Sequence, residues 1–354
     1  MRDTEHEKAR RAITDMGILA APDIYFDPRY GKTCESIEGG KAEVFEYKSA
    51  HGHICHQFIR RKIDQKVGGK EYFDLITPYG YGGPLIVSCE GDKETLIKGF
   101  QEAFSNYCKE NHVVSEFVRF HPMIGNASDF GSMYEVNFSR YTVATNLRDY
   151  EDPFQAEFSK SCRKSIRRSI QRGVTYEILE KPDSFDTFIP IYYETMARNH
   201  ADSFYFFDRE YFNRCLQCLR DNIVLVNALY EGAVISSEFF FVWGKYIHSH
   251  LSGTLNSFLN LSPDYVIMYG IMEWGKRKGY HFIHTGGGTS NDPENPLYLF
   301  KKKFARNTDF DFYIGRRVWN QDIYDMLCGM TGQNDTGFFP AYRSRQAFDP
   351  TDCR

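Results

Sequence analysis

The chain has 354 residues, of which 42% are hydrophobic and 25% are charged, and its formal net charge is −4. This composition is typical of a globular protein and excludes the disordered and fibrous classes. The length predicts two domains, and a slightly acidic chain can contact nucleic acid only through a local basic patch.

Cysteine usage and hydropathy indicate the redox state of the thiols and the compartment of the protein. The nine cysteines are irregularly spaced, and an odd number does not fit a complete disulfide framework. The closest pair, Cys215 and Cys218, lies in a predicted helix without a second such pair, and no metal-ligand spacing is present, so we expect reduced thiols and no metal. The amino terminus lacks the apolar core of a signal peptide and no apolar run is long enough for a membrane span, which favours the cytoplasm.

Residues 1–150 predict an N-terminal domain that mixes strands and helices. Residues 1–20 have the charge pattern of a short helix. Alternating apolar runs in residues 42–87 predict strands, with a hairpin turn at Gly68-Gly69 between two of them. The C-terminal segment 320–354 is a candidate completion of this domain.

A loop rich in glycine and proline, TPYGYGGP, follows these strands. Its rings, Tyr79 and Tyr81, either contact a ligand or pack in the core, and we include both as candidate substrate-binding residues. An amphipathic helix is predicted over Thr95–Glu110, because apolar residues recur there at four-residue steps. The next predicted strand, Val113–His121, ends near Arg119, a third candidate for substrate binding.

A dense basic helix begins the second predicted domain, residues 151–319. The run SKSCRKSIRRSIQRG carries cations on one side and apolar residues on the other, and it ends at Gly173. No acid lies among the cations, which are Lys160, Arg163, Lys164, Arg167, Arg168 and Arg172. Such a stripe is either a solvated face or, as we expect here, an anion-binding surface, since the planar fork of arginine suits phosphate.

The rest of the second domain predicts a ligand-binding unit near its end. Two helices and a three-stranded antiparallel meander come first. A helix over Asp264–Lys278 then ends at Gly279, and a short strand leads into the triple glycine Gly286-Gly287-Gly288. A basic helix follows with the sequence FKKKF, and the order closes with one strand and one helix.

This order of elements is that of the GNAT acyltransferase fold. With the motifs SCRKSIRRSIQRGV, IYYETMARN, YFFDREYF, LYEGAVISS and FKKKF, the triple glycine, and TPYGYGGP and FVRFHP in the first half, the chain resembles the Fem-like (FemAB) family. The resemblance covers residues 40–330. It implies an α/β (α+β) fold of two tandem GNAT-like domains, each a mixed, mostly antiparallel sheet flanked by helices.

The resemblance also implies acyl transfer to an amine. The best-known members move an amino acid from aminoacyl-tRNA onto the stem peptide of a peptidoglycan precursor. This implies charged tRNA as co-substrate, no resident cofactor and a phosphate-bearing or lipid-linked acceptor. It places Lys301 beside the transferring acyl group, and Arg163 and Arg167 at the phosphate-bearing end of the acceptor.

Two other interpretations stay open. An acyl-CoA-dependent N-acyltransferase acting on an amino sugar or small amine is the first alternative. Coenzyme A is disfavoured because the loop Thr254–Asp264 has none of the glycines with which GNAT enzymes hold its pyrophosphate. The second alternative is an inactive binding module for anionic glycans or RNA, in which Lys301 would be dispensable.

Three further features are candidates for the chemistry. Glu238 is a carboxylate within the apolar strand ISSEFFFVW, which makes it either a general base or half of a buried ion pair. His250 shares a predicted strand face with His248, so it either contacts substrate or belongs to a polar strand face. Gly286 and Gly287 let backbone approach a ligand, or merely form a turn. No nucleophile and base arrangement is present, so we expect no covalent intermediate.

Overall fold

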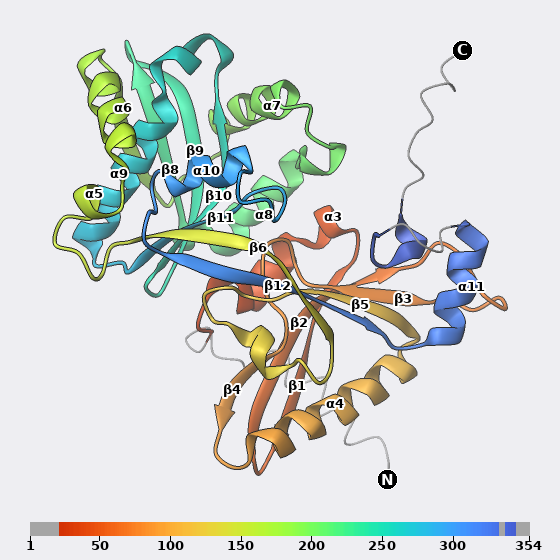
Figure 1. The fold of residues 1–354 in the computed structure, drawn as a ribbon. Coiled ribbons are helices and arrows are strands. Elements are labelled where there is room, and N and C mark those ends of the chain that lie inside the picture. The colour runs from red at the N-terminus through yellow and green to blue at the C-terminus, as the bar shows by residue number, and fades with distance from the viewer. Residues whose placement is uncertain (1–20, 333–336, 345–354) are drawn as a thin grey trace, which may run out of the picture. The chain divides into compact units, whose positions relative to one another are not determined.

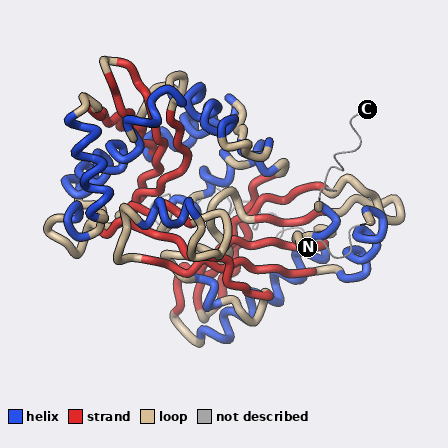
Figure 2. The backbone as a smooth tube through the Cα atoms, turned by 45° about the horizontal axis from the view of Figure 1, so that its top comes forward, coloured by secondary structure: helices blue, strands red, loops and turns tan. Residues whose placement is uncertain are grey.

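The computed structural model describes residues 21–332 and 337–344, so the helix predicted over residues 1–20 lies outside the described residues. This part of the chain divides into two compact units, each built from separate segments. Unit 1 contains the described residues up to Ile37 together with Phe138–Phe312, and unit 2 contains Glu38–Asn137 together with the described residues from Tyr313. In both units strands form the centre and helices pack along them (Figure 2).

Unit 1 is built on a mixed sheet in the order β6-β11-β10-β9-β8-β7. The strands are β6 (Glu135–Asn146), β7 (Thr175–Glu180), β8 (Ile223–Tyr230), β9 (Ala233–Trp243), β10 (Tyr246–Thr254) and β11 (Phe282–Gly287). β10 and β11 pair in parallel, and the other neighbours pair antiparallel. The predicted meander is therefore present as β8-β9-β10.

Helices cover both faces of this sheet. They are α2 (Pro28–Thr33), α5 (Pro153–Ala156), α6 (Lys160–Gln171), α7 (Phe188–Arg198), α8 (Arg209–Leu219), α9 (Pro263–Lys278) and α10 (Pro296–Lys302). α9 packs on β7, β8 and β9 and carries α6 on its outer side, while α7 packs on β9 and β10 from the other face (Figure 1). The predicted basic helix is α6. It ends at Gln171, and Arg172 is its cap.

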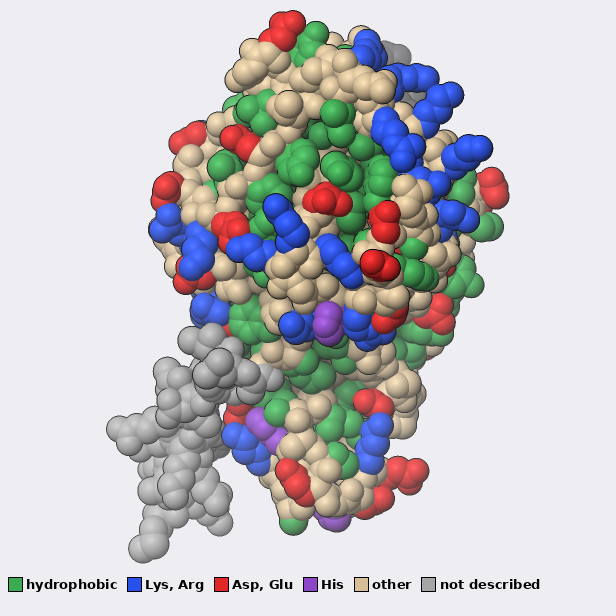
Figure 3. Space-filling view, turned by 90° about the vertical axis from the view of Figure 1, so that its left-hand side faces the viewer, with side chains coloured by type: hydrophobic (Ala, Val, Ile, Leu, Met, Phe, Trp, Pro, Cys, Tyr) green, Lys and Arg blue, Asp and Glu red, His purple; other side chains and the backbone are tan. Residues whose placement is uncertain are grey.

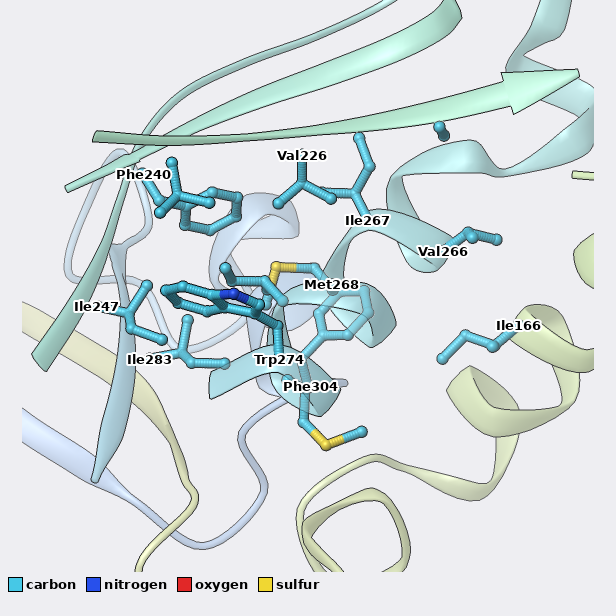
Figure 4. Close-up of a cluster of buried hydrophobic side chains, with 14 of the residues drawn as sticks. Ile166, Val226, Phe240, Ile247, Val266, Ile267, Met268, Trp274, Ile283 and Phe304 are labelled. Carbon is cyan, nitrogen blue, oxygen red and sulfur yellow. The ribbon is translucent and has the colours of Figure 1, made fainter. Parts of the chain in front are cut away.

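The larger core of unit 1 lies between α9 and the sheet. Figure 4 shows Ile267 of α9 beside Val226 of β8 and Trp274 of α9 beside Ile247 of β10, whereas Val266 lies on the side of Ile166 of α6. Each of these side chains is at most 5% exposed, so each contributes about 1.5–3 kcal/mol to folding through burial. This packing fixes where α9 begins, and with it the geometry of the site described below.

The carboxyl end of α9 depends on a left-handed glycine. Gly279 has φ +77°, and its N–H donates to the carbonyls of the last turn. We expect Gly279→Ala to lower the free energy of unfolding by about 1–2 kcal/mol, because a Cβ disfavours this conformation although no atom lies within 4 Å of it. Urea denaturation measures the change.

The control for this variant is Gly329→Ala. Gly329 also has open space around it, but it lies inside α11 (Gln321–Thr331) at ordinary helical angles. Alanine there should raise stability by up to about 1 kcal/mol. Equal effects at the two positions would contradict the conformational explanation.

Unit 2 contains the sheet order β1-β2-β3-β5-β12, with β4 pairing to β2 beside β3. The strands are β1 (Lys41–Ser49), β2 (Gly52–Lys62), β3 (Phe73–Ile76), β4 (Leu85–Cys89), β5 (Val113–Arg119) and β12 (Asp309–Val318), of which β12 begins in unit 1. The predicted amphipathic helix is α4 (Lys93–Glu110), and it buries Leu96, Phe100 and Phe104 against this sheet. The predicted turn at Gly68-Gly69 has positive φ at both residues.

The division into units differs from the predicted boundary at residue 150. The described residues before Ile37 pack on unit 1, because Asp23 Oδ2 lies 2.8 Å from His248 Nε2 and Trp243 Nε1 donates to Ala21 O over 2.8 Å. Nothing in the sequence of this segment indicated those partners, since both are more than 200 residues away. The short helices α2 and α3 (Glu35–Glu38) were not predicted either.

The described residues after α11 are held to the rest of unit 2 by a buried carboxylate. Asp74 is fully buried and accepts hydrogen bonds from Arg61, Tyr342 and Arg343. The Tyr342 hydroxyl also lies 2.7 Å from Ser115 Oγ. Because a buried carboxylate is stable only when it is paired, Asp74 ties the end of the described chain to β3 and β5.

Candidate active site

The site of unit 1 begins where two neighbouring strands stop pairing. β10 and β11 pair only over Tyr246–His248 and Phe282–His284, although both strands continue further. Each strand has a register shift directly after its paired part, between Ser249 and Leu251 in β10 and between His284 and Gly286 in β11. Beyond these shifts β10 stays paired with β9 and β11 stays paired with β6, but β10 and β11 no longer pair with each other.

Glu238 lies on β9 next to this point. It shares the sheet face of Phe240, the face covered by α9, since alternate residues of a strand point the same way. Its Oε1 accepts a hydrogen bond of 2.5 Å from Ser249 Oγ across the strands. Burial raises the pKa of Glu238 to about 7, and the Ser249 hydroxyl and the charge of Lys301 oppose that rise.

Lys301 lies on α10 and approaches the end of β11. Its Nζ donates to Gly287 O over 2.9 Å, the only acceptor it has among the described residues, so two of its three N–H donors are not used. Burial lowers the pKa of Lys301 to about 8, with the Glu238 charge acting upwards and Arg140 downwards. Arg140 on β6 donates to Gly288 O over 2.7 Å and so holds the same loop.

Glu238 and Lys301 form a separated pair of opposite charges. They influence each other's pKa but make no ion pair within 4 Å, and both are described residues. Burial moves the two pKa values toward neutrality from opposite directions. The pair can therefore exchange a proton with a substrate amine and hold a cation near a developing oxyanion at neutral pH.

The glycines after His284 are required by the fold. Gly286 has φ +71° at the register shift of β11. A Cβ on Gly287 would lie 2.4 Å from Tyr141 O, and one on Gly288 would lie 2.5 Å from Asn295 Oδ1. These contacts explain the glycines without a ligand. β11 continues through Gly287, so the turn begins at Gly288.

The amino end of α10 is positioned by a residue that the sequence analysis missed. Asn295 Oδ1 accepts from Leu297 N and Tyr298 N, and its Nδ2 donates to Thr289 Oγ1. Asn295 is therefore both the cap of α10 and the anchor of the loop after β11. The signal in the sequence is Asn-Pro before a helical run, a common cap arrangement.

Asp264 occupies the first turn of α9 beside this pair. Burial raises its pKa to about 6, while the backbone N–H groups of Tyr265 and of Asp264 itself lower it. The carboxylate therefore lies at the amino end of α9, near the N–H group of Tyr265, which donates to Ser262 O over 3.3 Å. From the sequence, Asp264 could be predicted only as the first residue of a helix, because its approach to Glu238 depends on how α9 packs.

The cations of α6 divide into one structural arginine and an exposed row. Arg163 donates to the carbonyls of Gln155 and Phe158 and is half-buried, so it holds the end of α5. Arg167 is exposed and lies over the ring of Phe154 at 5.6 Å. Among the described residues, neither the five cations within α6 nor Arg172 at its cap has a carboxylate partner. The side that carries α6 in Figure 1 faces the viewer in Figure 3, where lysine and arginine side chains follow one margin.

His250 lies away from the pair formed by Glu238 and Lys301. It is the extra residue at the register shift of β10, and its ring packs against Phe239 and Phe241, on the sheet face opposite Glu238. Its Nε2 lies 2.5 Å from Tyr211 Oη. Burial lowers the pKa of His250 to about 3, with His248 acting in the same direction, so the ring is neutral. The ring of His250 thus lies among aromatic rings and not on a polar strand face.

Three candidate residues belong to unit 2. Tyr79 and Tyr81 lie half-buried in the predicted loop. Arg119 forms an ion pair of 2.6 Å with Glu38 and donates to Thr77 O over 2.6 Å, so its guanidinium holds this loop to β5. The structure brings Glu238, Lys301 and Gly287 together in unit 1. Tyr79, Tyr81 and Arg119 lie in unit 2 instead.

Comparison with known proteins defines the class. Residues 156–294 match the acetyltransferase (GNAT) domain family. FemX has a similar structure, with TM-score 0.63 and 14% identity over 92% of this chain and 98% of that chain. The C-terminal domain of a putative lysylphosphatidylglycerol synthetase from Agrobacterium fabrum gives TM-score 0.55 and 14% identity, over 89% and 92% of the two chains. L-PGS from Bacillus licheniformis gives 0.52 and 14%, over 91% and 99%.

The chain therefore has a fold of the GNAT class. It has the tandem GNAT fold of the Fem-like proteins, as the sequence resemblance implied. No curated protein matches the sequence. Within the described residues, no helix is both long and apolar enough to cross a bilayer.

Proposed function

We propose that the protein is a Fem-like N-acyltransferase that moves an aminoacyl group from aminoacyl-tRNA to an amine of a peptidoglycan-precursor-like acceptor. The observation that carries the proposal is the separated Glu238 and Lys301 pair, with pKa values near 7 and 8 at the end of β11. Amide formation needs an unprotonated amine and a cation for the oxyanion, and this pair supplies both requirements.

In the proposed reaction, Glu238 accepts a proton from the acceptor amine as its nitrogen attacks the ester carbonyl of the donor. Lys301 donates hydrogen bonds to the oxygen that becomes negative. The C–N bond forms, the C–O bond to the ribose breaks, and the proton leaves on the ribose oxygen. Two unused donors on Lys301 Nζ support its role, since Gly287 O occupies only one.

The start of α9 supports an aminoacyl-tRNA donor over coenzyme A. GNAT enzymes that bind coenzyme A hold its pyrophosphate on free N–H groups at the corresponding helix terminus. Here Asp264 places a carboxylate at that helix terminus. A pyrophosphate would meet a like charge. The match to an acetyltransferase domain family keeps an acyl-CoA donor as the second candidate.

Reconstitution with both donors tests the proposal. The purified chain is incubated with a nucleotide- or lipid-linked muropeptide and either a mixture of charged tRNAs or acetyl-CoA, and products are identified by mass spectrometry. We expect aminoacylated acceptor from charged tRNA only, and none after the tRNA has been deacylated. Turnover with acetyl-CoA and none with charged tRNA would replace the proposal by its alternative.

The exposed row on α6 is the proposed contact for the phosphate of the acceptor. We expect Arg167→Ala to raise KM for a phosphate-bearing acceptor by about ten-fold at low salt, because a charge-assisted hydrogen bond is lost. The difference from the unmodified enzyme should shrink as salt rises, since ions screen an exposed contact.

The matched control is Arg209→Ala. Arg209 is also exposed in unit 1, but it pairs with Asp186 at 2.6 Å. The KM of the Arg209→Ala variant for the phosphate-bearing acceptor should not change. Steady-state kinetics at several salt concentrations decide the matter, and an unchanged KM in Arg167→Ala would remove the phosphate contact from the proposal.

A further inference from the structure

The hairpin β1-β2 of unit 2 brings three metal-ligating side chains to one place. Glu46 on β1 is directly opposite Cys55 on β2, so both side chains lie on the same face of the hairpin. His53 is two residues before Cys55 and therefore shares that face. α4 packs on β1 and β2, and Ile54, which separates the two ligand residues, lies in the core beneath it.

The ligand atoms are spaced as a small metal ion requires. Cys55 Sγ lies 3.1 Å from His53 Nε2 and 3.7 Å from Glu46 Oε1, and the latter two atoms are 3.9 Å apart. Tetrahedral zinc bound at about 2.0–2.3 Å sets ligand atoms about 3.4–3.6 Å from one another. Each observed distance is within half an ångström of that range, which side-chain rotation can supply.

The surroundings fit a partly enclosed site. The Glu46 and His53 side chains are 16% and 17% exposed, and Cys55 is buried. Lys48 pairs with the other carboxylate oxygen of Glu46, Oε2, at 3.0 Å, which leaves Oε1 directed at Cys55 and His53.

We propose that Glu46, His53 and Cys55 form a binding site for a divalent transition metal of the zinc class. The three protein ligands are thiolate, imidazole and carboxylate, a set that suits zinc and cobalt, and a fourth position is left for water or another ligand. Binding displaces the thiol proton of Cys55 to solvent and involves no change of oxidation state.

This proposed site differs from the expectation, drawn from the sequence, that the protein binds no metal. Glu46, His53 and Cys55 do not form a ligand motif along the chain, because one ligand is contributed across the strand pair. Without metal the thiol keeps its proton, since burial raises the pKa of Cys55 to about 12. The proposal is independent of the acyl-transfer site, which lies in unit 1.

Cobalt titration of the full chain tests the site. The protein is stripped with chelator, kept reduced and titrated with Co²⁺ while the thiolate-to-cobalt absorption in the near ultraviolet is recorded. We expect one equivalent to bind and Zn²⁺ to displace it. Cys55→Ser should abolish the thiolate band, and His53→Ala should weaken binding by about 100-fold or more.

Two controls separate this site from adventitious binding. Cys89→Ser changes an exposed thiol on β4, which also pairs with β2, and should leave the band intact. Lys48→Met removes a neighbouring cation and should tighten binding by about three-fold to ten-fold. A wild-type chain without the band, or a band that survives Cys55→Ser and His53→Ala, would overturn the proposal. Circular dichroism confirms that each variant is folded.

Discussion

Replacing Lys301 by methionine is expected to lower kcat by about 10²–10³-fold and to leave KM nearly unchanged. Methionine keeps the length of the side chain and removes only the ammonium group. That ammonium lies over the end of β11 with two donors unused, and it is the cation nearest to Gly287 O. An interaction made only in the transition state affects kcat rather than substrate binding.

Lys302→Met is the matched control for this variant. Lys302 is the next residue of α10, but its Nζ is engaged with Asp309 at 2.6 Å and Arg306 O at 3.0 Å. Its loss should change kcat by less than about three-fold, since the pair is peripheral. Equal losses in the two variants would show that α10 needs its lysines for folding, and full activity in Lys301→Met would remove Lys301 from the proposed mechanism.

Glu238→Gln is expected to lower kcat by about 10²–10⁴-fold and to change its pH dependence. In the unmodified enzyme, activity should rise through about pH 7 as Glu238 loses its proton and fall above about pH 8 as Lys301 loses its own. The result is a narrow maximum. Because the two groups interact, these midpoints belong to the pair.

The two variants should each remove one side of that profile. Glu238→Gln should lose the acidic side and keep the alkaline one, whereas Lys301→Met should do the reverse. Stopped-time assays between pH 5.5 and about 9.5, with the acceptor saturating, give the comparison. A profile that is unchanged in Glu238→Gln would assign the general base to another group, for which Asp264, with a pKa near 6, is the next candidate.

Local pattern predicted the elements that carry this chemistry. The four-residue steps of α4, the glycine cap of α9 and the meander β8-β9-β10 are all present in the structure. These features depend on residues close together in sequence, and the strand order then follows from short turns. The apolar context of Glu238 likewise indicated a buried carboxylate, and it is 7% exposed.

What could not be predicted depends on contacts between distant residues. The cations of α6 look equivalent in sequence, yet Arg163 is held by carbonyls of the preceding turn while Arg167 is exposed. His250 shares the alternation of its strand, but the residues around its ring come from β9 and from Tyr211 of α8. Asp264 approaches Glu238 only because α9 crosses the sheet, and no local signal encodes that crossing.

The interleaved path of the chain has a consequence for synthesis on the ribosome. Glu38–Asn137 of unit 2 is made before Phe138–Phe312 of unit 1, but the strand partner that β5 needs, Ile314–Val318, is made after all of unit 1. The edge of β5 is therefore unprotected until translation is almost complete, and such edges favour aggregation. Neither unit can be expressed as one continuous fragment, so truncated forms that stop before residue 313 should require chaperones or precipitate.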